Sequence, residues 1–182
     1  MARVTKFLKP FLNYSEENIL SGFTSNTKDD ITVSATHDSS NAYKACDDDE
    51  GTIWAAAGHQ TWCGNPYPFI PGSGGTVDFF ISFGTPLSLW KMQMYQATGW
   101  SGVGTFNISE DNGSTWIEIG ALPLANGEYG TLEFTDYIDY EVNLVKLHFT
   151  GMPYAVSSPV DCVTQGMDTY TIKLFKVING YG

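Results

Sequence analysis

The stretch that decides the fold runs from residue 45 to residue 54: Ala45-Cys46-Asp47-Asp48-Asp49-Glu50-Gly51-Thr52-Ile53-Trp54. It places three oxygen-bearing side chains, those of Asp47, Asp49 and Thr52, within six positions. Hard cations such as calcium take several oxygen ligands, including backbone carbonyls of a tight turn. The glycine and the distal glutamate of an EF-hand are not at the required spacing. The residues alone leave two interpretations open: a calcium-binding turn, and a solvated acidic turn that Thr52 caps.

Alternation of apolar and polar residues dominates the rest of the chain. Residues 77–83 are the clearest case, because Val77, Phe79, Ile81 and Phe83 alternate with less apolar neighbours. Similar patterns occur around residues 31–36, 90–95, 106–108, 116–119, 132–134, 144–149 and 170–174. The run Glu110-Asp111-Asn112-Gly113-Ser114 is a strong hairpin signal. About seven or eight short strands separated by turns predict an all-β fold, an antiparallel β-sandwich.

The length of 182 residues suits one domain, and a hydrophobic content of 42% with only 16% charged residues argues against disorder. Residues 1–28 are less patterned and are expected to form an N-terminal arm that docks on a partner, ahead of a domain over 29–182. Within the arm, residues 13–20 are expected to form one short helical turn with Ser15 as its N-cap.

The deciding stretch resembles the signature of the discoidin family, also called coagulation factor 5/8 type C or galactose-binding-like domains. The matching residues are Ala45, Cys46, Asp47, Asp49, Thr52 and Trp54, whereas Asp48 stands where the family usually has glycine. The hairpin segment from Phe106 to Trp116 resembles a second family motif, and the similarity covers about residues 30 to 180. The resemblance implies an eight-stranded jelly-roll sandwich.

Many carbohydrate-binding members of that family hold a structural calcium near this turn. The resemblance implies Asp47 and Thr52 as side-chain ligands, with backbone carbonyls near Ala45 and Asp49 contributing. The family usually supplies a glutamate from the last strand, and this chain has Lys173 there. The Lys173 ammonium could instead occupy the place of the cation and bridge to Asp47, so calcium and lysine remain alternatives.

Three connections are longer than the strands need: about 55–75, 96–104 and 151–168. The resemblance implies that they cluster at one end of the sandwich, where aromatic rings could pack on a sugar face while polar neighbours read its hydroxyls. The residues expected to bind this ligand are His59, Trp62, Asn65, Tyr67, Trp100 and Tyr154. Gln96 and Asp161 lie behind them as further polar candidates. Alternatively, the rings only pin the loops to the sandwich.

Three cysteines are too few for a disulfide-built scaffold. Cys46 occupies an apolar position of its motif and is expected to be a small buried residue. Cys63 and Cys162 lie in two of the long loops, so a disulfide and two free thiols both remain open, and the loop clustering implied by the resemblance favours pairing.

The net charge of −11 disfavours binding to nucleic acids and to anionic membrane surfaces. No apolar run is long enough for membrane insertion. The N-terminus is basic but lacks the apolar core of a signal peptide, which predicts synthesis in the cytosol and release, if any, by lysis or on a virion surface.

The sequence does not favour an enzyme. It has no Gly-x-Ser-x-Gly nucleophile elbow, no phosphate-binding glycine loop and no second His/Cys pair to complete a zinc site with His59 and Cys63. Asp136 and Asp139 lie in a polar connection, where solvated charges are the default. His148 alternates within a strand and is expected to be packed or surface-exposed there. No catalytic residue is therefore predicted.

Two functional classes remain. The first is a non-catalytic module that recognises carbohydrate through the aromatic loops, on a glycan or glycoprotein surface. The second is a structural or decoration protein of a phage virion, in the capsid, a fibre or the tail, which would use the domain for assembly as a homo-oligomer or for adhesion to host or mucosal glycans.

Overall fold

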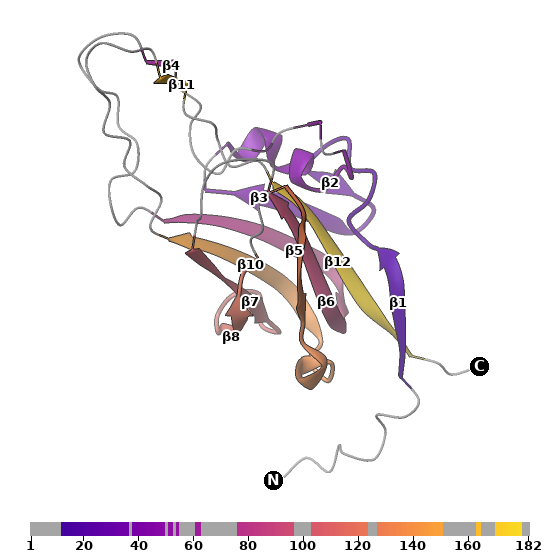
Figure 1. Cartoon of the computed structure of the whole chain (residues 1–182). Helices are drawn as coiled ribbons and strands as arrows, with labels where there is room; N and C mark the ends of the chain where they lie inside the picture. Colours follow the sequence, from indigo (N-terminus) through magenta and orange to yellow (C-terminus); the bar gives the residue numbers. More distant parts are fainter. Residues whose placement is uncertain are drawn as a thin grey trace.

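Period-two alternation builds almost the whole protein, as the sequence predicts. In the computed structural model, the described residues are 12–36, 38–49, 51–52, 54, 61–62, 76–96, 103–123, 127–150, 163–164 and 170–179. They form a four-stranded and a six-stranded antiparallel sheet, packed face to face as a β-sandwich (Figure 1). Within this part of the chain, no helix is long and apolar enough to cross a bilayer.

The four-stranded sheet has the order β1-β12-β6-β9 and the six-stranded sheet the order β2-β3-β5-β10-β7-β8. Their strands are β1 (Leu12–Asn18), β2 (Thr27–Lys28), β3 (Ile31–Ala35), β5 (Val77–Leu87), β6 (Leu89–Gln96), β7 (Val103–Ser109), β8 (Ile117–Ala121), β9 (Tyr129–Glu133), β10 (Val142–Thr150) and β12 (Tyr170–Asn179). A separate pair joins β4 (Thr61–Trp62) and β11 (Val163–Thr164). Two 3-10 helices complete the described elements: η2 (Ser39–Ala45) and η3 (Thr135–Tyr137).

Strand β5 shows how the alternation creates the core. Val77, Phe79, Ile81 and Phe83 are buried between the sheets, while the residues between them face outward and are half-buried. The facing strands β6 and β12 contribute a second buried set: Leu89, Met92, Met94, Ile172 and Leu174. The predicted β-sandwich is thus confirmed, together with the strands expected along the chain.

The hairpin between β7 and β8 is also confirmed. Asn112 and Gly113 have positive φ angles of 56° and 85°, a conformation that asparagine and glycine tolerate better than other residues. The carboxylate of Asp111 accepts hydrogen bonds from the backbone and hydroxyl of Thr115 and from the hydroxyl of Ser109. These bonds, those of Thr115 first, lower the pKa of Asp111 below its usual value.

The N-terminal region differs from the expectation. Residues 12–18 form strand β1, which pairs with β12, instead of a helical turn capped by Ser15. Leu20 and Phe23 are buried in the core, so the described part of the expected arm over residues 1–28 belongs to the sandwich. The polar residues 13–18 did not predict a strand, because apolar and polar residues need not alternate in an edge strand with a bulge.

Trp54 and Cys46 anchor the deciding stretch in the core, and both are fully buried. The Trp54 ring packs edge-on against Phe79, with centroids 4.7 Å apart. Burial, together with the neighbouring Asp47 carboxylate, raises the pKa of the Cys46 thiol. Cys46 is therefore the inert, apolar residue that its motif position predicts.

Candidate functional site

Three neighbouring strands of the six-stranded sheet, β5, β10 and β7, start or stop at the same end of the sandwich. Strand β10 runs antiparallel to both of its neighbours, so its last residue, Thr150, pairs with Val103 at the start of β7, and Phe149 pairs with Val77 at the start of β5. The three long connections therefore border these strand ends. In the other sheet they border the end of β6 and the start of β12, where Gln96 pairs with Tyr170. We call this end of the sandwich the loop end.

The first and third long connections also meet each other. Trp62 pairs with Val163 and Thr61 with Thr164 in the antiparallel pair β4–β11, which Figure 1 shows beyond the edge where β10 ends. The pairing joins segments about 100 residues apart in sequence. Of the residues predicted to bind a ligand, Trp62 lies in β4. The other predicted residues lie outside the described part of the chain: His59, Asn65, Tyr67, Trp100 and Tyr154. Asp161, Cys63 and Cys162 lie outside it as well.

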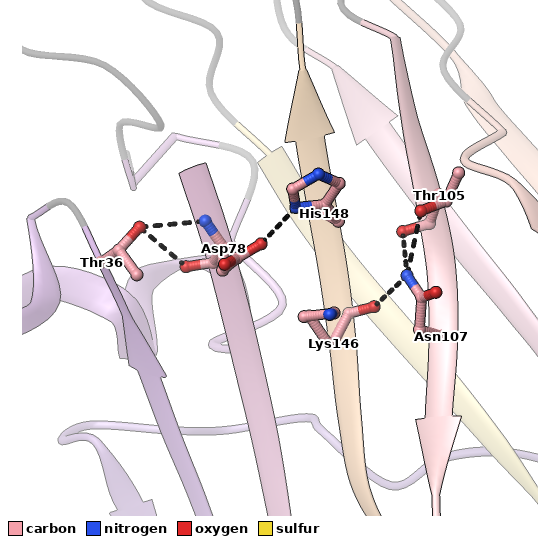
Figure 2. Close-up of polar contacts among 6 residues, drawn as sticks. All are labelled: Thr36, Asp78, Thr105, Asn107, Lys146 and His148. Atoms are coloured by element: carbon pink, nitrogen blue, oxygen red, sulfur yellow. Dashed lines mark hydrogen bonds and ion pairs between the residues drawn. The ribbon is translucent and has the colours of Figure 1, made fainter. Parts of the chain in front are cut away.

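A polar cluster occupies the outer face of the sheet at the loop end, and we call it the His148 cluster (Figure 2). His148 on β10 pairs with Asp78 on β5, and its Nδ1 lies 2.5 Å from the Asp78 carboxylate. The hydroxyl of Thr36 accepts a hydrogen bond from the backbone N–H of Asp78 at 2.9 Å. The His148 and Asp78 side chains retain 32% and 26% of their exposure, so solvent and solutes reach them.

The other half of the cluster lies on β7. Thr105 is the cross-strand partner of His148 on that side. The amide nitrogen of Asn107, a buried residue, donates to the Thr105 hydroxyl at 3.0 Å, to the Thr105 carbonyl at 3.2 Å and to the Lys146 carbonyl at 3.4 Å. These contacts hold the Thr105 hydroxyl in place on the residue that pairs with His148.

Gly104 allows the strands to meet closely at this point. A Cβ atom at this position would lie 2.6 Å from the His148 carbonyl oxygen and 2.5 Å from the side chain of Leu122. Any larger residue at position 104 would push β7 away from β10 and separate Thr105 from His148.

Aromatic and cationic side chains flank the cluster one row further along the strands, on the same face. Phe80 pairs with Lys146, which in turn pairs with Asn107. The Lys146 ammonium lies 4.3 Å from the centroid of the Trp116 ring. The centroids of the Phe80 and Trp116 rings are 6.4 Å apart. Among the described residues, no carboxylate forms a salt bridge with Lys146. The cation–π contact fixes the indole against the sheet.

A histidine oriented by a carboxylate can act as a general base or as a hydrogen-bonding group. A base would need a nucleophile or an acidic proton within hydrogen-bonding reach. In the described part of the chain, no hydroxyl or thiol is hydrogen-bonded to the second ring nitrogen of His148. The arrangement of imidazole, hydroxyl and amide matches the polar groups that read sugar hydroxyls.

The Asp47 turn (residues 47–52) is the second polar centre, and its groups satisfy one another. The hydroxyl of Thr52 donates to Asp47 Oδ2 at 2.5 Å and lies 3.0 Å from the Asp49 carbonyl oxygen and 3.5 Å from that of Lys44. The other oxygen of the Asp47 carboxylate accepts from the backbone N–H of Asp49 at 3.0 Å. Three oxygens, from Asp47, Asp49 and the neighbouring Lys44, therefore surround the Thr52 hydroxyl.

Lys173 reaches this turn, but through a different residue from the one expected. Its ammonium lies 3.1 Å from the Asp48 carboxylate, so the expected bridge to Asp47 is instead a bridge to Asp48. Partial burial opposes its charge, but hydrogen bonds to Asp48 and to Tyr129 outweigh burial and raise the pKa of Lys173. Asp48 has φ of 65°, a left-handed conformation that explains glycine in the family and that aspartate tolerates.

The donor set of the Asp47 turn matches part of a calcium site. One carboxylate, one hydroxyl and two carbonyls are hard oxygen ligands, and calcium takes six to eight of them. However, the last strand contributes an ammonium beside the turn rather than a second carboxylate. Among the described residues, no three His, Cys, Asp or Glu side chains gather to hold a metal. The residues fit a metal poorly, and calcium stays a prediction of the resemblance.

Known proteins resemble this chain in fold and not detectably in sequence. No protein-family profile matches the chain. No curated protein matches it by sequence. The fold is similar to chitosan-binding module 1 of a chitosanase/glucanase from Paenibacillus sp. IK-5, with a TM-score of 0.50, 16% identity and coverage of 82% of this chain and 95% of the module.

A labelled variant of the same module gives a TM-score of 0.54 at 14% identity, covering 87% of this chain and 98% of the module. An F5/8 type C domain from Bacteroides fragilis is also similar, with a TM-score of 0.48, 14% identity and coverage of 85% and 96%. The similarity to the chitosan-binding module, at TM-scores of 0.50 and 0.54, supports the predicted β-sandwich fold.

Sequence reasoning did not single out the His148 cluster. Asp78 and His148 both occupy the outward positions of their strands, which the alternation of residues does reveal. Their contact depends on which strands are neighbours and in which register, and both follow from the whole sandwich. The sequence holds one local signal. Asp78 lies just after the first long connection, and His148 lies just before the third.

Proposed function

We propose that this protein is a non-catalytic carbohydrate-binding module whose ligand binds at the loop end. The observation that carries the proposal is the His148 cluster at the end of a rigid sandwich where the strands β5, β7 and β10 border the three long connections. Long loops on a rigid scaffold are a usual place for recognition. The fold shared with a chitosan-binding module supports the ligand class.

The aromatic residues of the loops are proposed as the sugar platform. Trp62 lies in the β4–β11 pair, and Trp100 and Tyr154 belong to the other two long connections. Pyranose C–H groups pack on the apolar faces of aromatic rings, and buried aromatic residues carry much of the binding energy at recognition sites. Loss of a platform ring would therefore weaken sugar binding without unfolding the sandwich.

Glycan-array screening of the whole chain, followed by calorimetry, tests the proposal. The Trp62→Ala and Trp100→Ala variants are expected to bind the best sugar about tenfold more weakly or worse. Tyr14→Ala is the control, because Tyr14 is an exposed ring opposite Val177, near the other end of β12. If the intact protein binds no glycan, the proposal is wrong.

Assembly into a larger particle is the alternative function. The observation that favours it is the exposure of Tyr14 and Ile178 on the paired strands β1 and β12, at 39% and 46%. Edge strands with exposed apolar side chains are common sites of association. Light scattering after size exclusion tests it: a defined oligomer that Tyr14→Ser and Ile178→Ser dissociate would support assembly, and a strict monomer would contradict it.

A further inference from the structure

We propose that His148 and Thr105 together bind two neighbouring hydroxyl groups of an uncharged sugar, with His148 as the hydrogen-bond acceptor and Thr105 as the donor. The inference rests on the proposed carbohydrate-binding function and deepens it, because it assigns two described residues and a ligand chemistry to the loop end. Neither residue belongs to the aromatic loops.

The role of His148 follows from its partner. The Asp78 carboxylate only accepts hydrogen bonds, so the contact at 2.5 Å places the proton of the neutral imidazole on Nδ1. The second ring nitrogen then carries a lone pair. Figure 2 shows this nitrogen directed away from Asp78 and toward the end of β10, where the long connection begins. Thr36 holds the Asp78 backbone from the other side, which fixes the orientation of the pair.

The role of Thr105 follows from Asn107 in the same way. The Asn107 amide donates to the Thr105 hydroxyl, so this hydroxyl already accepts one hydrogen bond and keeps its own proton for donation. Asn107 is buried and makes three contacts through the same nitrogen, which leaves it little freedom to turn. The donor beside His148 is therefore preorganised.

The pair of groups selects the ligand chemistry. Directly opposite residues on antiparallel strands have Cβ atoms roughly 4.5–5.5 Å apart, so one small molecule can contact both side chains. Each sugar hydroxyl donates and accepts, and adjacent hydroxyls of a pyranose can meet an acceptor and a donor together. A carboxylate or phosphate needs donors only and would face the lone pair of the imidazole. The geometry therefore favours an uncharged sugar over an anion.

The first experiment is an array of uncharged and carboxylated saccharides, including galactose and N-acetylchitotriose, probed with the whole chain. The best uncharged sugar is then titrated by calorimetry into the His148→Ala and Thr105→Val variants. Each variant is expected to bind about tenfold more weakly, the effect of one lost hydrogen bond. Thr32→Val is the matched control, because Thr32 is an outward threonine of the same sheet at β3, bonded to Thr27, and its affinity should change by less than about twofold.

The second readout is the ring nitrogen of His148 in ¹⁵N-labelled protein. Its Nε2 resonance should move when the sugar is added, because hydrogen bonding to a lone pair changes the shielding of that nitrogen, and a merely structural histidine would not respond. If His148→Ala does not fold, Thr105→Val and the resonance still decide.

Three results would overturn the inference, and they separate it from the proposed function. If the chain binds an uncharged sugar but both variants bind as tightly as the parent, the module stands and the inference falls. If it binds carboxylated sugars only, the module again stands and the inference falls. If it binds no saccharide at all, both fall.

Discussion

The Asp47 turn and the His148 cluster are both polar centres built around an aspartate, yet they differ in where their hydrogen bonds end. In the turn, the Asp47 carboxylate bonds to Thr52 and Asp49, so its groups close on one another within six residues of chain. In the cluster, Asp78 on β5 bonds to His148 on β10 and to Thr36 just after β3, and one ring nitrogen of His148 points away from Asp78 toward the end of β10. A closed network stabilises the fold, whereas an open one can receive a ligand.

The largest expected effect is a difference in the free energy of unfolding between variants of Asp47 and of Asp78. Asp47→Ala should lower the free energy of unfolding by about 1–3 kcal/mol, because it removes the carboxylate that accepts from both the Thr52 hydroxyl and the Asp49 N–H. Asp78→Ala should cost only about 0–1 kcal/mol, since its pair with His148 is partly solvated. Urea unfolding of both variants measures this difference. Equal losses would contradict the division between a structural and a binding centre.

A second prediction concerns calcium at the Asp47 turn. Because the Lys173 ammonium already neutralises Asp48, we expect millimolar calcium or a chelator to change the Tm of the protein by less than about 1 °C. In Lys173→Glu, a carboxylate would adjoin the acidic turn, and calcium should raise Tm by about 5–10 °C at roughly 100-fold above Kd.

Lys173→Met is the control for the calcium experiment, because it removes the ammonium without adding a ligand. Its Tm should not respond to calcium. Strong stabilisation of the unmodified protein by calcium would show that the metal, and not the ion pair, holds the turn.

The smallest expected effect is the alkaline titration of the same ion pair. The pKa of Lys173 is raised in the folded protein, so the pair stabilises the fold fully below the pKa of an unfolded lysine and loses its effect as pH rises through the higher folded value. The difference in Tm between the protein and Lys173→Met should be constant near neutral pH and shrink at strongly alkaline pH. A difference that persists after the lysine is deprotonated would assign the effect to packing.

The comparison also explains what could be read from the sequence. The Asp47 turn is local, so its residues and its link to Trp54 are visible as a short motif, and so is the hairpin at Asn112 and Gly113. The strands followed from alternation, which records one buried face. Strand β1 was missed because its residues are largely polar and its pairing with β12 joins opposite ends of the chain.

The candidate site was harder to predict for the same reason. Contacts between Asp78 and His148 or between Thr105 and Asn107 depend on strand order and register, which no local pattern encodes. The resemblance did predict that long connections meet at one end, and the pairing of Trp62 with Val163 confirms this for two of them. The proposed ring platform of Trp62, Trp100 and Tyr154 stays a prediction.

The most direct test of the account is a map of sugar-induced chemical shifts over the whole ¹⁵N-labelled chain, with the best ligand from the glycan array. The account predicts that the perturbed amides gather at the loop end, around His148, Thr105 and the β4–β11 pair, while those of the Asp47 turn stay unchanged. Perturbation confined to another surface, such as the outer face of β6 and β9, would contradict it.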